Sequence, residues 1–300
     1  MKVLITGATG LIGKEIVKQC LQNNIEVNYL TTSSKKIENT PKYRGFFWNP
    51  KLGEIDTSSI NGTDAIIHLA GASISNRWTS SYKEEIIESR VLSASLLFNT
   101  LHKNTHTVKQ FISSSGVNIY PESLDKVYTE KSPEVENSFL GNVVVKWEES
   151  ADKFTIEKIK VAKIRTGVVL DAEDGALPKL MQPIKLGVGS QLGTGKQWQS
   201  WIHIKDIAAI YLFVLKNQLD GIFNAVSPNP VTNKEMTQAI AKKLDKPLWM
   251  PNVPAVALNA MLGEMATLVL DGQRVSSKKL ENAGFVFKYP TIEAALEELL

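Results

Sequence analysis

Residues 2–13 read KVLITGATGLIG, and this stretch decides the fold. Residues 2–6 have the apolar character of a buried strand. The apolar positions Ile12, Ile16, Val17 and Leu21 recur at the spacing of an amphipathic helix over residues 11–23. Glycines 7 and 10 lie between the two elements, and Gly13 lies in the first turn of the predicted helix. A glycine-rich turn that joins a strand to a helix is typical of a βαβ unit that binds a dinucleotide.

Each glycine of this turn has a separate expected role. Gly7 permits the tight turn, Gly10 lets the backbone approach a diphosphate, and Gly13 lets the helix pack closely on the strand. The first helical turn offers free N–H groups and the positive end of the helix dipole to phosphate. An ordinary strand–turn–helix is the alternative, but both the spacing and the flanking elements favour phosphate binding. The predicted contacts are Gly7, Thr9, Gly10, Leu11, Ile12 and Gly13.

Short apolar runs alternate with amphipathic segments along the next 150 or so residues, roughly the length of one domain. This alternation predicts an α/β fold with a doubly wound parallel sheet of the Rossmann type. We expect the dinucleotide-binding domain to comprise residues 1–170 plus 201–230. Residues 171–200 plus 231–300 are rich in glycine and proline turns or short helices, and we expect a smaller C-terminal lid or substrate domain there.

Composition excludes several classes of protein. The 300 residues are 43% hydrophobic and carry a formal net charge of only +3, without a basic stripe, so nucleic-acid binding is disfavoured. No apolar run approaches the length of about 18 residues that a membrane span needs. The lone Cys20 has no partner for a disulfide, and no Cys/His cluster has metal-ligand spacing. These features predict a cytoplasmic protein without a metal.

The end of the second strand bears on the choice of cofactor. In NAD-binding units, an acidic residue about 20 positions beyond the glycines binds the ribose 2′-hydroxyl. Here the strand ends YLTTSSKK (residues 29–36), without a carboxylate. Hydroxyls and lysines can bind a 2′-phosphate, whereas a carboxylate would repel it. This favours NADP(H), bound through Thr31, Thr32, Ser33 and Lys35, over NAD or a merely solvated turn.

The Gly-x-x-Gly-x-x-Gly spacing and the segment DAIIHLAG (residues 64–71) resemble the extended, epimerase-like branch of the short-chain dehydrogenase/reductase superfamily. Segments at 77–79, 193–198, 201–204, 224–228 and 271–275 narrow the resemblance to an atypical family often labelled sugar-nucleotide epimerase or cell-division inhibitor. The resemblance covers essentially the whole chain. It implies cofactor contacts from Leu69, Ala70 and Gly71, and from Glu85 and Arg90 on the following helix. For those last two, solvated helix surface is the alternative.

The resemblance also implies a catalytic tyrosine with a lysine four residues later, which lowers the pKa of the phenol. None of the 7 tyrosines has a lysine at that offset. When the helix is aligned on Glu148, the two positions fall on Leu140 and Val144. The remaining catalytic candidates are Ser115, which matches a substrate-binding position of the family, and Tyr120 and Lys146. Structural roles are the alternative for all of them.

Aromatic and cationic side chains suit a substrate with a ring and a phosphate. The substrate candidates are Arg77, Trp78, Trp198 and Trp201, with His203 as a structural anchor or catalyst. We therefore expect an NADP(H)-dependent oxidoreductase or epimerase-like enzyme acting on a small, phosphate- or nucleotide-bearing substrate. A non-catalytic NADP(H) sensor is the alternative. Wide apolar surfaces on the helices at 80–102 and 139–154 favour a homodimer over a monomer.

Overall fold

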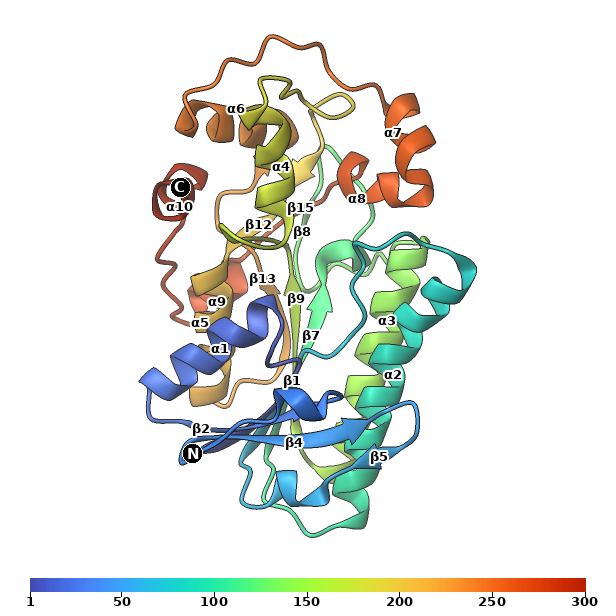
Figure 1. The fold of residues 1–300 in the computed structure, drawn as a ribbon, viewed down its shortest axis with the longest axis vertical. Coiled ribbons are helices and arrows are strands. Elements are labelled where there is room, and N and C mark those ends of the chain that lie inside the picture. The colour runs from blue at the N-terminus through green and yellow to red at the C-terminus, as the bar shows by residue number, and fades with distance from the viewer. The chain divides into compact units, whose positions relative to one another are not determined.

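A computed structural model describes residues 1–300, which form two compact units (Figure 1). The first unit comprises Met1–Gly116, Asn142–Arg165 and Ala208–Phe223, and the second comprises Val117–Gly141, Thr166–Ile207 and Asn224–Leu300. These boundaries differ from the predicted ones. Residues 117–141, 166–170, 201–207 and 224–230 belong to the second unit.

The main sheet has nine strands and confirms the predicted doubly wound α/β fold. Its strand order is β13-β9-β7-β6-β1-β2-β4-β3, with β5 paired to β4. The pairs β1–β2, β1–β6, β2–β4 and β6–β7 are parallel. The central strands are β1 (Lys2–Thr6), β2 (Glu26–Thr31), β4 (Tyr43–Asn49), β6 (Ala65–His68), β7 (Gln110–Gly116), β9 (Lys160–Thr166) and β13 (Gly221–Ala225). Sequence analysis missed two short antiparallel strands, β3 (Asn39–Thr40) and β5 (Glu54–Ile55).

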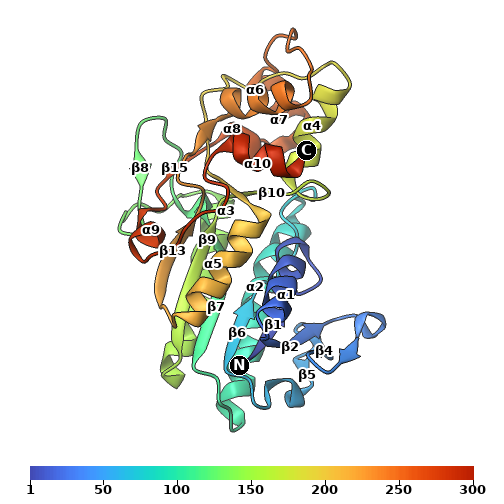
Figure 2. The same ribbon diagram turned by 90° about the vertical axis from the view of Figure 1, so that its left-hand side faces the viewer.

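Helices cover both faces of the sheet in the first unit. Helices α2 (Ser80–Lys103) and α3 (Phe139–Asp152) lie on one face, and α1 (Leu11–Gln22) and α5 (Ile204–Lys216) lie on the other (Figure 1, Figure 2). Because the strands are covered on both sides, they are continuous apolar runs. The rings of Phe111 on β7 and Phe154, just after α3, stack with centroids 3.7 Å apart.

The register of the parallel strands brings the predicted cofactor segments to one edge. Thr6 pairs with Leu30 on β2 and with His68 on β6, and His68 pairs with Ser113 on β7. The glycine turn, residues 31–35 and residues 69–71 therefore lie at the carboxyl ends of neighbouring strands, and Ser115 lies within β7, one residue before its end. That edge is where open α/β sheets bind their ligands.

The second unit has its own apolar core, which includes Leu177, Met181, Trp201, Ile240 and Leu296. Its helices are α4 (Ala176–Lys185), α6 (Asn233–Lys243), α7 (Ala255–Leu262), α8 (Thr267–Leu270), α9 (Lys278–Asn282) and α10 (Ile292–Leu299). Its short strands pair as β10 (Val168–Leu170) with β12 (Trp201–His203), β11 (Trp198–Gln199) with β14 (Val231–Thr232), and β8 (Val127–Tyr128) with β15 (Arg274–Val275).

Two details of local structure complete the fold. Strands β9 and β10 are separated at Gly167, where a Cβ atom would lie 2.0 Å from the Ser200 carbonyl oxygen. Helix α6 begins with a capping box, in which the side chains of Thr232 and Glu235 each bond the other's backbone N–H. None of the helices combines the length and the apolar character that crossing a membrane would require.

Candidate functional site

The glycine turn between β1 and α1 has no room for side chains. Gly7 has a φ of +70°, and its carbonyl oxygen accepts a hydrogen bond from Gly10 N at 3.0 Å. A Cβ atom on Gly13 would lie only 2.1 Å from that same oxygen. The turn therefore requires glycine at positions 7 and 13, as predicted for a diphosphate-binding loop.

The start of α1 is open to an anion. Gly10 is its N-cap and has no side chain to accept from the first backbone N–H groups, and the first turn contains no acidic residue. Thr9, Leu11 and Ile12 are half-buried around it. Unpaired N–H groups at the positive end of a 12-residue helix suit a phosphate.

A buried hydrogen-bond chain ties the turn to the end of β6. The Thr6 hydroxyl accepts hydrogen bonds from Leu69 N and Ala70 N, both at 3.1 Å, and lies 2.8 Å from His68 Nδ1. The other ring nitrogen of His68 lies 3.2 Å from Ser93 Oγ. Burial lowers the pKa of His68 to about 3, so its ring is neutral. Sequence analysis missed this role of His68, although a histidine inside an apolar strand is a recognisable signal.

Arg90 lies against the same edge as a buried cation. Its guanidinium donates to Ala72 O at 3.2 Å and Ile86 O at 2.8 Å, and a Cβ on Gly71 would come within 2.9 Å of its Cζ. The group stacks over the Trp147 ring at 4.6 Å. Burial lowers the pKa of Arg90 to about 10, its Nε atom has no partner, and no carboxylate pairs with it.

The structure does not bring Glu85 to Arg90. Glu85 is half-buried and lies 3.9 Å from Lys51 Nζ, whereas Arg90 points into the protein. The two residues are five positions apart, so they occupy different faces of α2. Arg90 is therefore at the predicted edge, and Glu85 is on the outer surface beside the β4–β5 turn.

The segment after β2 presents hydroxyl and ammonium groups. Thr31 is buried and its hydroxyl accepts from Ser33 N at 3.2 Å, which orders the turn. Thr32 and Lys35 are exposed, and Ser33 is half-buried. The segment contains no carboxylate that would repel a phosphate.

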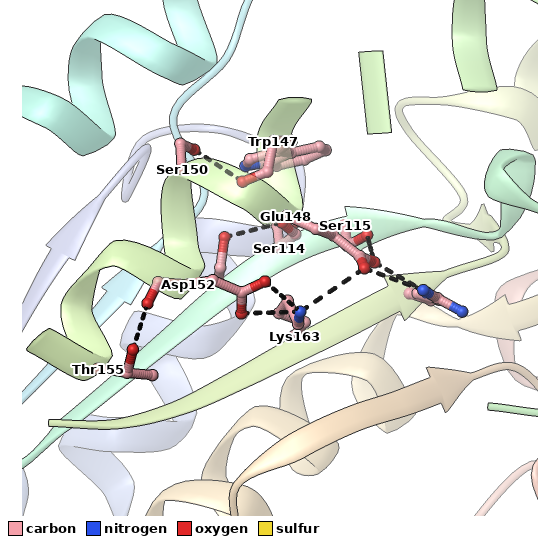
Figure 3. Close-up of polar contacts among 10 residues, drawn as sticks. Ser114, Ser115, Trp147, Glu148, Ser150, Asp152, Thr155 and Lys163 are labelled. Atoms are coloured by element: carbon pink, nitrogen blue, oxygen red, sulfur yellow. Dashed lines mark hydrogen bonds and ion pairs between the residues drawn. The ribbon is translucent and has the colours of Figure 1, made fainter. Parts of the chain in front are cut away.

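The Ser115 side chain is part of a buried network of hydrogen bonds and ion pairs that joins β7, α3 and β9 (Figure 3). Its hydroxyl donates to Glu148 Oε1 at 2.6 Å, and Arg165 binds both oxygens of Glu148 at 2.8 and 2.9 Å. Lys163 bonds Asp152 at 2.8 Å and lies 3.9 Å from Glu148. Burial alone would raise the pKa of Glu148, but Arg165, Ser115 and Lys163 outweigh it and lower the pKa.

This network corrects the expectation for Ser115. Its hydroxyl is a donor inside the protein, and the residue is only 3% exposed. In the sequence, Glu148 was recognised only as the reference position for aligning this helix with the family's tyrosine–lysine helix. Two cations in the apolar strand, Lys163 and Arg165, were a signal that the covering helix carries a buried acid.

The other two catalytic candidates also differ from expectation. Tyr120 is fully buried in the second unit, where its hydroxyl donates to Asn224 Oδ1 at 2.8 Å and its ring stacks on Tyr128. It does not present its phenol to a ligand. Lys146 is exposed on α3, and the positions that replace the dyad, Leu140 and Val144, are buried and apolar.

Two substrate candidates, Trp201 and His203, are fully buried. Trp201 is fully buried in the core of the second unit, and its indole N–H donates to Asn229 O at 3.1 Å. His203 is also buried, stacks on Tyr289 with centroids 3.8 Å apart, and accepts from Lys205 N at 3.0 Å. Burial lowers the pKa of His203 to about 4, so its ring stays neutral.

The remaining substrate candidates keep some open surface. Trp198 is half-buried in the second unit, donates to Leu124 O at 2.7 Å, and lies 4.5 Å beneath the guanidinium of Arg274. In the first unit, Arg77 is exposed and Trp78 is half-buried, with its indole N–H bonded to Ile74 O. Sequence analysis did not identify Arg274 as the partner of Trp198.

Comparisons with known proteins agree with this geometry. A family model described as "NAD dependent epimerase/dehydratase family" matches residues 3–225, and a "Domain of unknown function (DUF1731)" matches residues 253–299. An epimerase family protein of Staphylococcus epidermidis is 34% identical over 302 residues, which cover 100% of this chain and 99% of the relative. One from Staphylococcus saprophyticus is 35% identical over 300 residues, covering 99% of this chain and 98% of the relative.

Two solved structures extend the comparison. The human epimerase family protein SDR39U1, crystallised with NADPH, superposes with a TM-score of 0.85 at 29% identity, over 100% of this chain and 99% of that one. A nucleoside-diphosphate sugar epimerase from Corynebacterium glutamicum gives a TM-score of 0.80 at 33% identity, over 100% of this chain and 58% of that one.

Proposed function

The chain belongs to the NAD dependent epimerase/dehydratase family, and we propose that it is an NADP(H)-dependent oxidoreductase or epimerase-like enzyme. Its substrate is a small molecule with a phosphate or nucleotide group. The choice of cofactor rests on residues 31–35, at the end of β2. Hydroxyl groups and a lysine occupy this segment, where NAD-binding units carry a carboxylate.

The residues of the first unit fit such a cofactor. The glycine turn and the start of α1 would hold the diphosphate, and Thr32, Ser33 and Lys35 would bind the 2′-phosphate. Leu69, Ala70 and Gly71 would border it. The negative charge of the cofactor would compensate Arg90, whose buried guanidinium has no carboxylate partner. When bound, the cofactor supplies or accepts a hydride.

The NADPH in the human relative supports the same choice. That protein is 29% identical across the whole chain, so its cofactor alone does not decide the matter for this one. The local chemistry is the independent argument. A carboxylate at the end of β2 would repel the 2′-phosphate, and this chain has none there.

A second candidate function, a non-catalytic NADP(H) sensor, rests on the site's proton chemistry. Leu140 and Val144 cannot transfer a proton, and the Ser115 hydroxyl is bonded to Glu148. Loss of a general acid costs about 10²- to 10⁴-fold in rate, which slows carbonyl reduction without excluding it. Trp198 beneath Arg274 offers a surface for a substrate, which favours an enzyme.

A turnover screen separates the two functions. Purified protein is mixed with NADPH and libraries of carbonyl and enone compounds, with and without phosphate groups, and NADPH oxidation is followed by absorbance. The enzyme predicts oxidation with at least one phosphate-bearing compound. Tight NADPH binding without turnover on any compound would contradict the enzyme and leave the sensor.

A further inference from the structure

Two buried arginines of the first unit use their guanidinium groups differently. Arg165 donates from Nε and Nη2 to the two oxygens of Glu148, at 2.8 and 2.9 Å. This edge of a guanidinium group binds a carboxylate or a phosphate through two parallel hydrogen bonds. In Arg90, both hydrogen bonds are instead made by Nη1, to the carbonyl oxygens of Ala72 and Ile86.

The Nε–Nη2 edge of Arg90 has no acceptor within the protein. Nε is enclosed without a hydrogen-bond partner, and Nη2 makes no hydrogen bond either but keeps some exposed surface. The residue is only 7% exposed, and no carboxylate forms an ion pair with it. A buried charge without a counter-charge and a buried N–H without an acceptor both reduce stability. A bound oxyanion would remove both costs.

The ring of Trp147 supplies a third donor. The Arg90 Cζ atom lies 4.6 Å from the centroid of this ring, so the guanidinium group stacks on the indole. Trp147 is only 8% exposed, and its indole N–H is also enclosed without a partner. The N–H of a buried tryptophan usually has an acceptor. Helices α2 and α3 therefore place unpartnered donors next to each other, and a single oxyanion would satisfy them.

These donors lie beside the end of β6, within the first unit. A Cβ atom on Gly71 would come within 2.9 Å of Arg90 Cζ, so the glycine makes room for the guanidinium group. In the sheet, β6 and β2 lie on opposite sides of β1. The phosphates of the cofactor are assigned to the glycine turn after β1 and to residues 31–35 at the end of β2. An oxyanion at Arg90 would therefore be a further one.

We propose that Arg90 and Trp147 form the subsite that binds an oxyanion group of the substrate, a phosphate or a carboxylate. The proposal rests on the proposed function and assigns residues to the recognition of the acidic group. The Nε–Nη2 edge of Arg90 donates to two oxygens of the group, and the indole N–H of Trp147 donates to the same group. The cofactor can offset the charge of Arg90 at a distance, but only an oxygen in contact satisfies these N–H groups.

The first test follows the donors directly by NMR. The full chain, saturated with NADPH, is titrated with inorganic phosphate or with acetate, and the ¹⁵N–¹H signals of the Arg90 Nε–H and the Trp147 indole N–H are recorded. We expect both signals to shift saturably. The Arg165 Nε–H, which is already bonded to Glu148, is the internal control and should not shift.

Three other outcomes are informative. Signals that respond to neither anion would overturn the proposal. Signals that shift on addition of NADPH and then ignore both anions would assign the oxyanion to the cofactor, and the substrate subsite would be wrong. If NADPH does not bind, the proposed function is contradicted instead, and titration of the chain alone still tests whether the two donors bind an anion.

Two conservative variants separate the donors. Trp147→Phe keeps the ring beneath the guanidinium group but removes the N–H, and Arg90→Lys keeps the charge but removes the bidentate edge. Each should weaken phosphate binding about tenfold or more, while calorimetry shows nearly unchanged NADPH affinity. Arg44→Lys, at an exposed position of β4, is the matched control and should change neither affinity. Full phosphate affinity in either Trp147→Phe or Arg90→Lys would contradict the proposal.

A compound that the turnover screen finds gives the last test. Arg90→Lys should raise the KM of the acidic compound about tenfold and leave the KM of its uncharged methyl ester unchanged. An equal change for both compounds would count against this proposal alone. Absence of turnover in the natural sequence would contradict the proposed function, and the anion titration would remain the test of the subsite.

Discussion

Gly13 is the residue of the glycine turn between β1 and α1 at which a Cβ atom would have the least room. Gly13→Ala would place a methyl group about where a Cβ now lies 2.1 Å from Gly7 O, so the turn has to open. We expect a loss of about 1–3 kcal/mol in the free energy of unfolding and at least a tenfold weaker NADPH affinity. Denaturant unfolding and calorimetry measure the two effects.

Gly53→Ala is the control for that substitution, because a Cβ atom on Gly53 would meet nothing within 4 Å and only the positive φ of +69° opposes an alanine there. It should leave NADPH affinity unchanged. If Gly13→Ala bound NADPH as tightly as the natural sequence, the turn would not be the diphosphate site.

Asp271 is expected to reduce stability at neutral pH. Burial and the charges of Glu122 and Glu136 raise its folded-state pKa to about 6, above the ordinary 3.8, so folding favours the protonated form and stability falls as pH rises between those values. Asp271→Asn should therefore match the natural Tm near pH 4 and exceed it by a few degrees at pH 8, a modest gain because the group is partly screened by water. A Tm difference that does not change with pH would contradict the assigned pKa.

At the residue scale, sequence predicts best where the constraint is local. The glycines at 7 and 13 are required by the backbone of a single turn, so their spacing can be recognised in the sequence. The state of Ser115 depends on Glu148 and Arg165, which are distant in the sequence and meet only in the folded protein. The raised pKa of Asp271 cannot be predicted from the local sequence either, because the charges that affect it, Glu122 and Glu136, come from other segments.

At the scale of elements, α3 and β9 are held together by the Glu148–Arg165 pair. Glu148→Gln removes the charge that Arg165 binds through two hydrogen bonds in a buried setting, so we expect a loss of about 3 kcal/mol in unfolding free energy at pH 7. Glu149→Gln, at the exposed neighbouring position, is the control and should change stability little. Denaturant unfolding measures both.

The effect of Glu148→Gln should depend on pH in a defined direction. The pKa of Glu148 is lowered, so its contribution is complete above the ordinary value of 4.5 and is lost as pH falls through the lowered value. The difference between variant and natural sequence should shrink in acid. A difference that stays constant down to pH 2 would contradict the assigned ion pair.

The elements that sequence predicts are those with a long periodic pattern. Strand β1 and helices α1, α2 and α3 lie within a few residues of their expected bounds. The strands β3 and β5 were missed because two-residue antiparallel segments have no period to recognise. The break at Gly167 was missed because it depends on Ser200, from a different part of the chain.

At the scale of the whole molecule, the homodimer stays a prediction. The wide apolar surface expected on α3 comprises Val143, Val144, Val145 and Trp147. All except the half-buried Val145 are buried in the chain's own fold, and Leu92 is the one exposed large apolar side chain of α2. An obligate dimer buries about 2,000 Å² or more of mainly apolar surface. A dimer interface formed by these helices would be more polar than that of an obligate dimer, so we expect the dimer to dissociate on dilution. Light scattering across concentrations tests this, and a constant mass near 33.2 kDa would exclude the dimer.

The central claim is that the first unit holds NADP(H), and the most direct test is titration calorimetry of the purified chain with NADPH and with NADH. The account predicts that NADPH binds more tightly. It also predicts that Thr32→Asp, which places a carboxylate against the 2′-phosphate, reverses the preference by weakening NADPH while sparing NADH. Tighter binding of NADH by the natural sequence, or no binding of either cofactor, would contradict the account.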